Sequence, residues 1–474
     1  MENYHRKNSI PQQERIILGC KANARENIAE LAREYHTNRE FIYEQKEKVI
    51  DTLNNSFDKE QEDEPTITLT DRLMEKIVFG CMVICKGSTE DTQEFMEQIF
   101  NQHLSVGTIS NIINSFADRA AAFNSSVCLD KIKVGAHDEI FQAGDPVLVG
   151  VDIQSTFIYL MDASDTREAD DWELALSEKK DQGLELETSV NDDGTGLKKG
   201  VNNAFPGINM QSDIFHGERK ISLAVYNLER AAYKAIGKEY DFKKKCDKKK
   251  DKYLEAYEDA VSKSNEAIKI YDMVNILYGW IREALGIGGE LYDERIFMLQ
   301  FAACELDKLD NKSQYLKAGI SYIMNHRKEL LTFVELAQKQ MEQLAQKEGI
   351  DVEALSLMWQ QRKYTKESCQ YNILEAKIGT VLKEQQQYIY VRDAFEEFIN
   401  KIVRSSSIVE CMNSLIRPYI FLKRVIRDKF MDLLQFYFNT RKYQRSRCKE
   451  RIGKSPIELL TGVDYAHPLE ILGY

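Results

Sequence analysis

The stretch VLVGVDIQSTFIYLMD (residues 147–162) contains two runs of β-branched, aliphatic and aromatic residues, separated by a polar break at Gln154 and Ser155. Such runs are typical of buried strands, and the short break favours a strand pair. Two further strands are expected at LETSVND (186–192) and INMQSD (208–213), with helices between the strands. Strands that alternate with helices predict an α/β sheet covered on both faces.

A long helical block is expected after the sheet. Residues 207–417 contain no proline and are rich in Leu, Glu, Lys and Gln. Because a proline costs roughly 3 kcal/mol inside a helix, a proline-free stretch of this length favours one helix after another. We therefore expect an all-α insertion between the sheet and the C-terminal region.

The N-terminal region shows a helix-turn-helix pattern. In residues 26–50, apolar residues recur at helical spacing on both sides of a break at 36–38. The second helix would present Arg39, Tyr43 and Lys46 on its open face, where they could reach a major groove. An ordinary helical hairpin fits the same pattern.

A second unit of this kind is expected after a polar linker at residues 58–65. Ser105 is placed to cap a recognition helix that carries Thr108, Asn111 and Asn114. The predicted organisation is a helix-turn-helix region (1–60), a second helical region (66–130), the first part of the α/β core (133–230), the helical insertion (231–400), and the second part of the core with a basic tail (401–474).

Composition excludes several classes of protein. Of the 474 residues, 43% are apolar and 30% are charged, which argues against wholesale disorder and against a fibrous protein. No apolar run approaches the roughly 18 residues of a spanning helix, so no membrane is expected as a partner. The nine cysteines are scattered singly, without a CxxC or CxxH pair, and indicate a reducing interior. We expect a cytoplasmic protein, associated with the nucleoid if the host is bacterial.

Charge is divided unevenly along the chain, whose net charge is −12. Residues 161–193 hold twelve acids and three bases, whereas residues 417–454 hold twelve bases and three acids. An acidic middle and a basic tail suit a protein that binds metal with one part and phosphate with another, although charged runs also occur as solvated faces.

Three acids stand where predicted strands or helices meet loops: Asp152, Asp192 and Glu410. Asp152 lies near the end of an apolar strand, where it is a candidate metal ligand or a turn aspartate that caps the hairpin. Asp192 ends the next clear strand, where a helix cap is the alternative. Glu410 lies on a predicted helix with Asn413 and Arg417 on the same face, where a capping box with Ser407 is the alternative.

The ordered set of motifs VLVGVD, SVNDDGTGLKKG, QSDIFH, SSSIVECMNSLIRPY and GKSPIELLTG, with the helical block before the fourth, resembles the DDE transposases. The layout is closest to insertion-sequence transposases and to the Mutator and hAT superfamilies. The resemblance covers roughly residues 133–465. It implies an RNase H-like core, a mixed sheet flanked by helices, which a helical insertion interrupts before the last catalytic acid.

Carried over by motif, the resemblance implies a catalytic and metal-binding triad of Asp152, Asp192 and Glu410. Asp193 is an alternative second acid. Asp213 and His216 match a Cys/Asp-x-x-His element of these families, and Asp213 is another alternative for the second acid.

The implied cofactor is a pair of Mg²⁺ ions, for which Mn²⁺ can substitute. Three converging carboxylates repel one another by up to about 4 kcal/mol per pair at 4 Å, so such a cluster needs cations. Two ions about 3.5 to 4 Å apart can hold both sides of a phosphodiester during in-line attack, and no protein nucleophile is required.

The implied activity is cleavage at transposon ends followed by strand transfer into target DNA. The implied partners are transposon-end DNA, target DNA and further copies of this chain in a homodimer or larger assembly. A domesticated, catalytically silent DNA-binding protein is the alternative, and a helical scaffold is a third possibility. Trp280 and Trp359 are candidates for base stacking or for core packing. Backbone contacts near the cleavage site are expected from the basic tail, at Lys423, Arg424, Arg427, Arg441, Lys442 and Arg445.

Overall fold

The computed structural model describes residues 10–57, 68–142, 144–309, 313–382, 385–422 and 428–474. The chain divides into two compact units, Met1–Leu73 and Met74–Tyr474. Each unit is described by itself.

Between residues 10 and 57, the first unit contains three helices, α1 (Gln12–Asn23), α2 (Ile28–Glu34) and α3 (Arg39–Phe57). Leu31 of α2 and Ile42 of α3 are buried in a small core that also includes residues of α1. The predicted helix pair with its break is present, and His36 in the break has a positive φ of 47°. Helix α1 was not predicted from the sequence.

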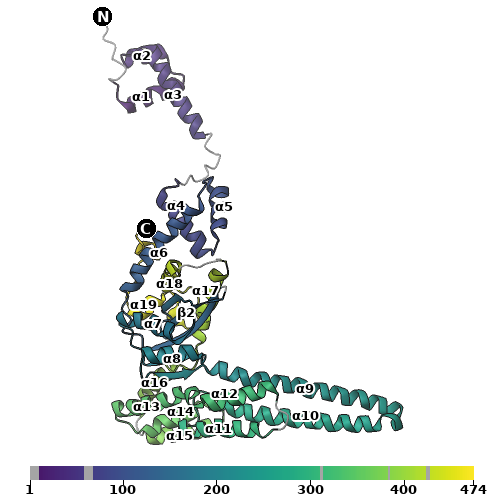
Figure 1. The fold of residues 1–474 in the computed structure, drawn as a ribbon. Helices are drawn as coiled ribbons and strands as arrows, with labels where there is room; N and C mark the ends of the chain where they lie inside the picture. The colour runs from purple at the N-terminus through teal and green to yellow at the C-terminus, as the bar shows by residue number, and fades with distance from the viewer. Residues whose placement is uncertain (1–9, 58–67, 143, 310–312, 383–384, 423–427) are drawn as a thin grey trace. The chain divides into compact units, whose positions relative to one another are not determined.

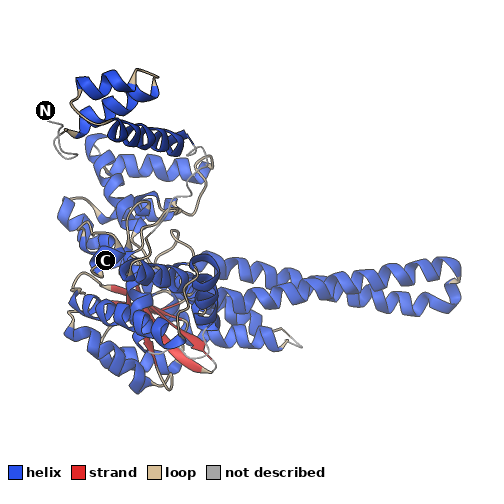
Figure 2. Cartoon of the chain, turned by 90° about the horizontal axis from the view of Figure 1, so that it is seen from above, coloured by secondary structure: helices blue, strands red, loops and turns tan. Residues whose placement is uncertain are grey.

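The second unit contains one mixed sheet, whose strands are drawn in red in Figure 2. The strand order is β3-β2-β1-β4-β5; β2 pairs antiparallel with β1 and β3, whereas β4 pairs parallel with β1 and β5. The strands are β1 (Val134–Gln142), β2 (Asp145–Asp152), β3 (Ile158–Ala163), β4 (Thr188–Asn191) and β5 (Asn209–Ser212).

The predictions from the sequence located β2 to β5 but missed β1. Strand β1 forms a tight hairpin with β2, in which Gln142 pairs with Asp145 and Gly144 adopts a φ of 110°. Such a φ favours glycine in a short hairpin loop. The missed strand lies at the centre of the sheet, between β2 and β4.

Helices cover both faces of the sheet. Successive residues of β1 point to opposite faces. His137 meets the ring of Trp172 in α7 at 5.8 Å, whereas Asp138 accepts a hydrogen bond from Asn413 in α17. Helices α7 (Ala169–Asp181) and α8 (Thr195–Ala204) lie on the first face and α17 (Ser407–Leu422) lies on the second, whereas α18 (Asp428–Thr440) packs along the edge strand β3, where the Asn439 amide binds both backbone groups of Ile158.

The helical region between β5 and α17 starts and ends at the same place. The backbone N–H of Ile214 donates to the carbonyl oxygen of Arg404 at 3.3 Å. Helix α9 follows β5 directly, so the region begins earlier than the predicted residue 231. Its helices are α9 (Ile214–Lys248), α10 (Lys250–Ala284), α11 (Tyr292–Asp307), α12 (Gln314–Leu330), α13 (Thr332–Glu348), α14 (Val352–Gln361), α15 (Cys369–Val381) and α16 (Gln385–Asn400).

The helices before the sheet pack on the C-terminal region. The side chain of Asn124 donates to the carbonyl oxygen of Asp432 in α18 at 2.9 Å, and Phe116 stacks on Tyr474. The remaining elements are α4 (Asp71–Phe79), the π-helix η2 (Gly80–Ile84), α5 (Thr89–Phe100), α6 (Val106–Ser126), the 3-10 helix η3 (Lys449–Arg451), α19 (Pro456–Thr461) and α20 (Pro468–Ile471). No helix in the described parts of the chain is long and apolar enough to cross a membrane.

The close approach of α7 and α8 generates a stability prediction. A Cβ at Gly200 of α8 would lie 2.5 Å from the carbonyl oxygen of Ala169 and would also overlap Trp172. Gly200→Ala is therefore expected to lower the free energy of unfolding by about 1–3 kcal/mol. Gly237→Ala is the control, because a Cβ there meets nothing within 4 Å, and it should raise stability by about 0.5–1 kcal/mol. Urea melts of both variants test this, and equal effects would contradict the packing.

Candidate active site

Two carboxylates lie side by side on the central strands. The parallel register pairs Val134 with Thr188 and Ala136 with Val190. Two residues further along both strands, the same register brings Asp138 next to Asp192, on one face of the sheet. Adjacent strands are about 4.8 Å apart, so the two side chains are close neighbours.

The environment of this pair is acidic and half-buried. Burial, and to a smaller extent the charge of Asp192, raise the pKa of Asp138 from 3.8 to about 6. The pKa of Glu139 is also raised, again by burial first and in part by Asp192. Neither Asp138 nor Asp192 has an ion-pair partner among the residues that the structure describes. The pair therefore carries negative charge that no described side chain neutralises.

Helix α17 reaches this pair through Asn413. The side-chain Nδ2 of Asn413 donates to Oδ2 of Asp138 at 2.7 Å, and the Asn413 side chain is fully buried. Its Oδ1 has no hydrogen-bond partner among the residues that the structure describes. Glu410 lies one turn earlier on the helix and is exposed. Helix α17 therefore packs on Asp138 through Asn413, while Glu410 stands on its exposed side, and no contact among the described residues joins the Glu410 carboxylate to Asp138 or Asp192.

Asp213 fixes the start of α17. Its Oδ2 accepts hydrogen bonds from the backbone N–H of Ser406 at 2.6 Å and from the hydroxyl of the same serine at 2.5 Å. Its Oδ1 caps α9 by accepting from the backbone N–H of His216 at 3.0 Å. The Asp213 carboxylate therefore joins two helices. The ring of His216 packs edge-on against Tyr322.

The structure does not bring Asp152 to Asp192, which corrects the predicted constellation. In the antiparallel register Asp152 pairs with Gly135, whereas Asp138 pairs with Val149. Asp152 is thus about 10 Å further along the sheet and on its opposite face. Its carboxylate accepts from the backbone N–H of Ser155 at 2.8 Å and from the Ser155 hydroxyl at 2.5 Å, as expected for a turn aspartate.

Sequence reasoning missed Asp138 because it missed β1. Polar His137, Asp138 and Glu139 interrupt the apolar pattern of this strand, so it lacks the continuous apolar run of β2. The usable signal was the glycine turn at Gly144, which has a strand-like segment on each side.

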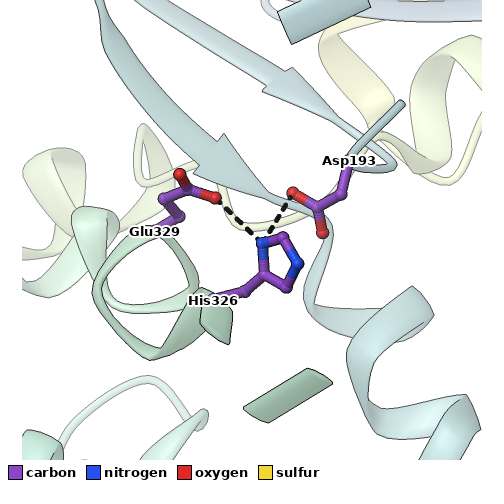
Figure 3. A group of neighbouring side chains, drawn as sticks. All are labelled: Asp193, His326 and Glu329. Carbon is purple, nitrogen blue, oxygen red and sulfur yellow. Dashed lines mark hydrogen bonds and ion pairs between the residues drawn. The ribbon is translucent and has the colours of Figure 1, made fainter. Parts of the chain in front are cut away.

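Asp193 belongs to a different cluster, shown in Figure 3. It has a φ of 73° and lies 3.6 Å from Nδ1 of His326, which in turn lies 3.1 Å from Oε2 of Glu329. In the described ranges, this is the one group of three such residues whose possible ligand atoms all lie within 4.8 Å. Lys198 pairs with both Asp193 and Glu329, so a side-chain cation already occupies the cluster. These contacts connect the loop after β4 to α12, and no motif in the sequence indicates His326 or Glu329.

The side chains of the proposed site suit hard cations as metal ligands. Asp138, Asp192 and Glu410 offer only carboxylate oxygens, the ligands that Mg²⁺ and Mn²⁺ prefer. The possible ligand atoms of these three residues do not all lie within 4.8 Å of one another, in contrast to those of the Asp193 cluster. A two-ion site has ligands that are shared between ions about 3.5 to 4 Å apart, which allows a wider spread of carboxylates.

The predicted DNA-contacting residues have different surroundings. Arg39 and Tyr43 are exposed on α3, and Lys46 is half-buried. Thr108 and Asn111 are exposed on α6, whose N-terminus Ser105 caps as predicted, its hydroxyl accepting from the backbone N–H of Thr108 at 3.0 Å.

Part of the basic tail lies beside α17. Arg441 and Arg445 are exposed and line a hollow of about 460 Å³ together with Met412 and Leu415 of that helix. The ammonium group of Lys442 pairs with Glu458 and Asp464. Arg417 is exposed on α17. The predicted contacts Lys423, Arg424 and Arg427 lie outside the described residues.

The candidate stacking residues differ from each other. Trp359 is fully buried, and its Nε1 donates to the carbonyl oxygen of Glu290 at 3.3 Å, so it packs in the core. Trp280 is 42% exposed and stacks on Phe301.

No model of a known protein family matches the chain, and a search of curated proteins finds no significant match. The site is therefore interpreted from its own geometry.

The raised pKa of Asp138 predicts a pH-dependent stability. An acid whose pKa rises on folding stabilises the folded state below its unfolded pKa, and this contribution is lost as the pH rises through the folded pKa. Between about pH 4 and pH 6, the wild type should lose up to about 3 kcal/mol that Asp138→Asn does not lose. Urea melts in the presence of a chelator, from about pH 4 to pH 8, measure the difference. Parallel stability curves would contradict the assigned environment.

Proposed function

We propose that the chain is a DDE transposase with an RNase H-like core, in which Asp138, Asp192 and Glu410 form the catalytic triad. The observation that carries the proposal is the pairing of Asp138 with Asp192 on adjacent parallel strands, together with the Asn413–Asp138 hydrogen bond one turn after Glu410. Asp138 replaces Asp152 as the first acid in this proposal, because the carboxylate of Asp152 is held in its own turn on the opposite face of the sheet.

The topology supports an RNase H-like core. Three strands joined by antiparallel pairing are followed by two strands parallel to the first, and a helix from the end of the chain covers the central strand. The start and end of the helical insertion meet at Ile214 and Arg404, so the insertion leaves the sheet intact.

Each residue of the triad has a distinct setting. Asp138 receives hydrogen bonds from Asn413 and from the backbone N–H of Glu139, which fix its carboxylate plane. The Oδ1 of Asp192 accepts from the backbone N–H of Gly194 at 3.3 Å. Glu410 is exposed on α17, and in this proposal its side chain turns toward the pair when metal is bound. Bound Mg²⁺ supplies Lewis-acid activation of water or of a 3′-hydroxyl and stabilises the leaving oxygen.

Several surfaces fit DNA as the substrate. The exposed face of α3 carries Arg39 and Tyr43, and Arg441 and Arg445 lie beside the helix that bears Glu410. The guanidinium groups of the three arginines suit the binding of phosphate. Because two element ends must be cut and joined to one target, the active form in this proposal is a homodimer or larger assembly. It acts in the cytoplasm, at the nucleoid in a bacterial host.

A cleavage assay tests the triad. The protein is incubated with Mg²⁺ and a linear DNA that carries the sequences flanking its gene, and the cut strands are resolved on a denaturing gel. Asp138→Asn and Glu410→Gln should each reduce the cleavage rate at least about 100-fold, which corresponds to about 2.7 kcal/mol of activation free energy. DNA binding in the absence of metal should stay within twofold of wild type.

Two neighbouring carboxylates provide matched controls. Glu139→Gln changes the adjacent residue on the opposite face of β1 and keeps an oxygen for the indole N–H of Trp172. Asp152→Asn removes the carboxylate that the sequence motifs placed first in the triad. Both should retain cleavage within about tenfold of wild type. Full activity of Asp138→Asn would refute the triad, whereas a wild type that binds but never cuts its flanking DNA would support the domesticated alternative.

A further inference from the structure

Helices α9 and α10 form a long antiparallel arm. Each has 35 residues, which corresponds to about 50 Å, and the two run side by side past the rest of the helical region (Figures 1 and 2). They meet at Lys249, which caps both helices. An arm of this length presents its end far from the sheet.

The end of the arm is strongly basic. Residues 240–253, YDFKKKCDKKKDKY, contain seven lysines and three aspartates. The structure describes six of the lysine side chains, all of them exposed, and we call these the lysine tip: Lys243, Lys244, Lys245, Lys248, Lys249 and Lys252.

The lysine tip is not neutralised by acids. None of its members forms an ion pair with a carboxylate in the described part of the chain, although Asp241 and Asp247 lie among them. Lysines elsewhere in the helical region behave differently, since Lys263, Lys339 and Lys401 each pair with an acid four residues earlier. The tip is therefore a concentrated positive field rather than an ordinary mixed surface.

An exposed stripe leads along α9 to this tip. Tyr226, Arg230, Tyr233, Tyr240 and Lys244 follow one another at intervals of four, three, seven and four residues, so they share one side of the helix, and all are exposed. Tyr226, Tyr233 and Tyr240 are 53%, 67% and 57% exposed. Tyrosine hydroxyls, guanidinium groups and ammonium groups all bind phosphate oxygens. From Tyr226 to Lys244 the stripe is about 27 Å long, which is most of one turn of duplex DNA.

We propose that the α9–α10 arm is a DNA-backbone clamp, which binds the phosphates of duplex DNA through the lysine tip and the α9 stripe, away from the catalytic carboxylates. This inference rests on the proposed function only in taking DNA as the partner. The ligand is the phosphodiester backbone rather than the base edges, because lysine acts as a point charge without bidentate geometry.

Salt dependence distinguishes this role from a general effect on the fold. The full-length protein is titrated onto a fluorescent 30-bp duplex in chelator, from about 50 to 200 mM NaCl, and affinity is read by anisotropy. The tip variant carries Lys244→Gln, Lys245→Gln and Lys248→Gln. It should weaken binding at least about tenfold at low salt and reduce the slope of log K against log[salt] by about 2–3, the number of phosphate contacts removed.

The control variant removes the same number of charges from paired lysines, through Lys263→Gln, Lys339→Gln and Lys401→Gln. It should bind within twofold of wild type with an unchanged slope. Equal slopes for the tip and control variants would overturn the clamp. The clamp would also be overturned if the tip variant bound DNA normally but lost binding to phosphatidylserine vesicles.

The clamp and the proposed enzymatic activity can be refuted independently of each other. The titration uses no metal and measures no cleavage, so an inactive protein whose affinity depends on the tip supports the clamp alone. A tip variant with wild-type DNA affinity that still cuts flanking DNA supports the enzyme alone.

Discussion

The hydrogen bond between Asn413 and Asp138 joins two parts of the chain that are 275 residues apart. It connects the central strand of the sheet to the helix that carries Glu410. Because Asn413 is fully buried, its side-chain amide needs hydrogen-bond partners inside the protein. The Asp138 carboxylate accepts from the amide nitrogen. The contact therefore fixes the position of α17 on the face of the sheet that carries Asp138.

A second set of contacts holds the two ends of the long helical region, between β5 and α17, together at the sheet. Asp213 caps α9 and also binds Ser406 just before α17, so the first and last residues of the helical region are held by one side chain. The polar cluster of Asp193, Lys198, His326 and Glu329 adds a contact between the loop after β4 and α12. The helical region is therefore attached to the sheet at its ends and at the loop that follows β4.

The sequence located the elements that have strong local patterns. Apolar runs predicted β2 to β5, the absence of proline predicted the helical region, and Asp192 and Glu410 were recognised at a strand end and on a helix. Strand β1 escaped because it carries His137, Asp138 and Glu139 in its middle. Its polar residues are buried or half-buried by partners from elsewhere in the chain: Ser189 for His137, and Asn413 for Asp138. A local sequence pattern contains no information about partners so distant, so Asp138 was not among the candidate residues predicted from the sequence.

The most direct measurement of the central claim is the position of Mn²⁺ in crystals, located by its anomalous scattering. The account predicts Mn²⁺ bound between Asp138 and Asp192, within coordination distance of both carboxylates, and with Glu410 turned toward it. Mn²⁺ bound at Asp152, or only at the Asp193–His326–Glu329 cluster with Lys198 displaced, would contradict it.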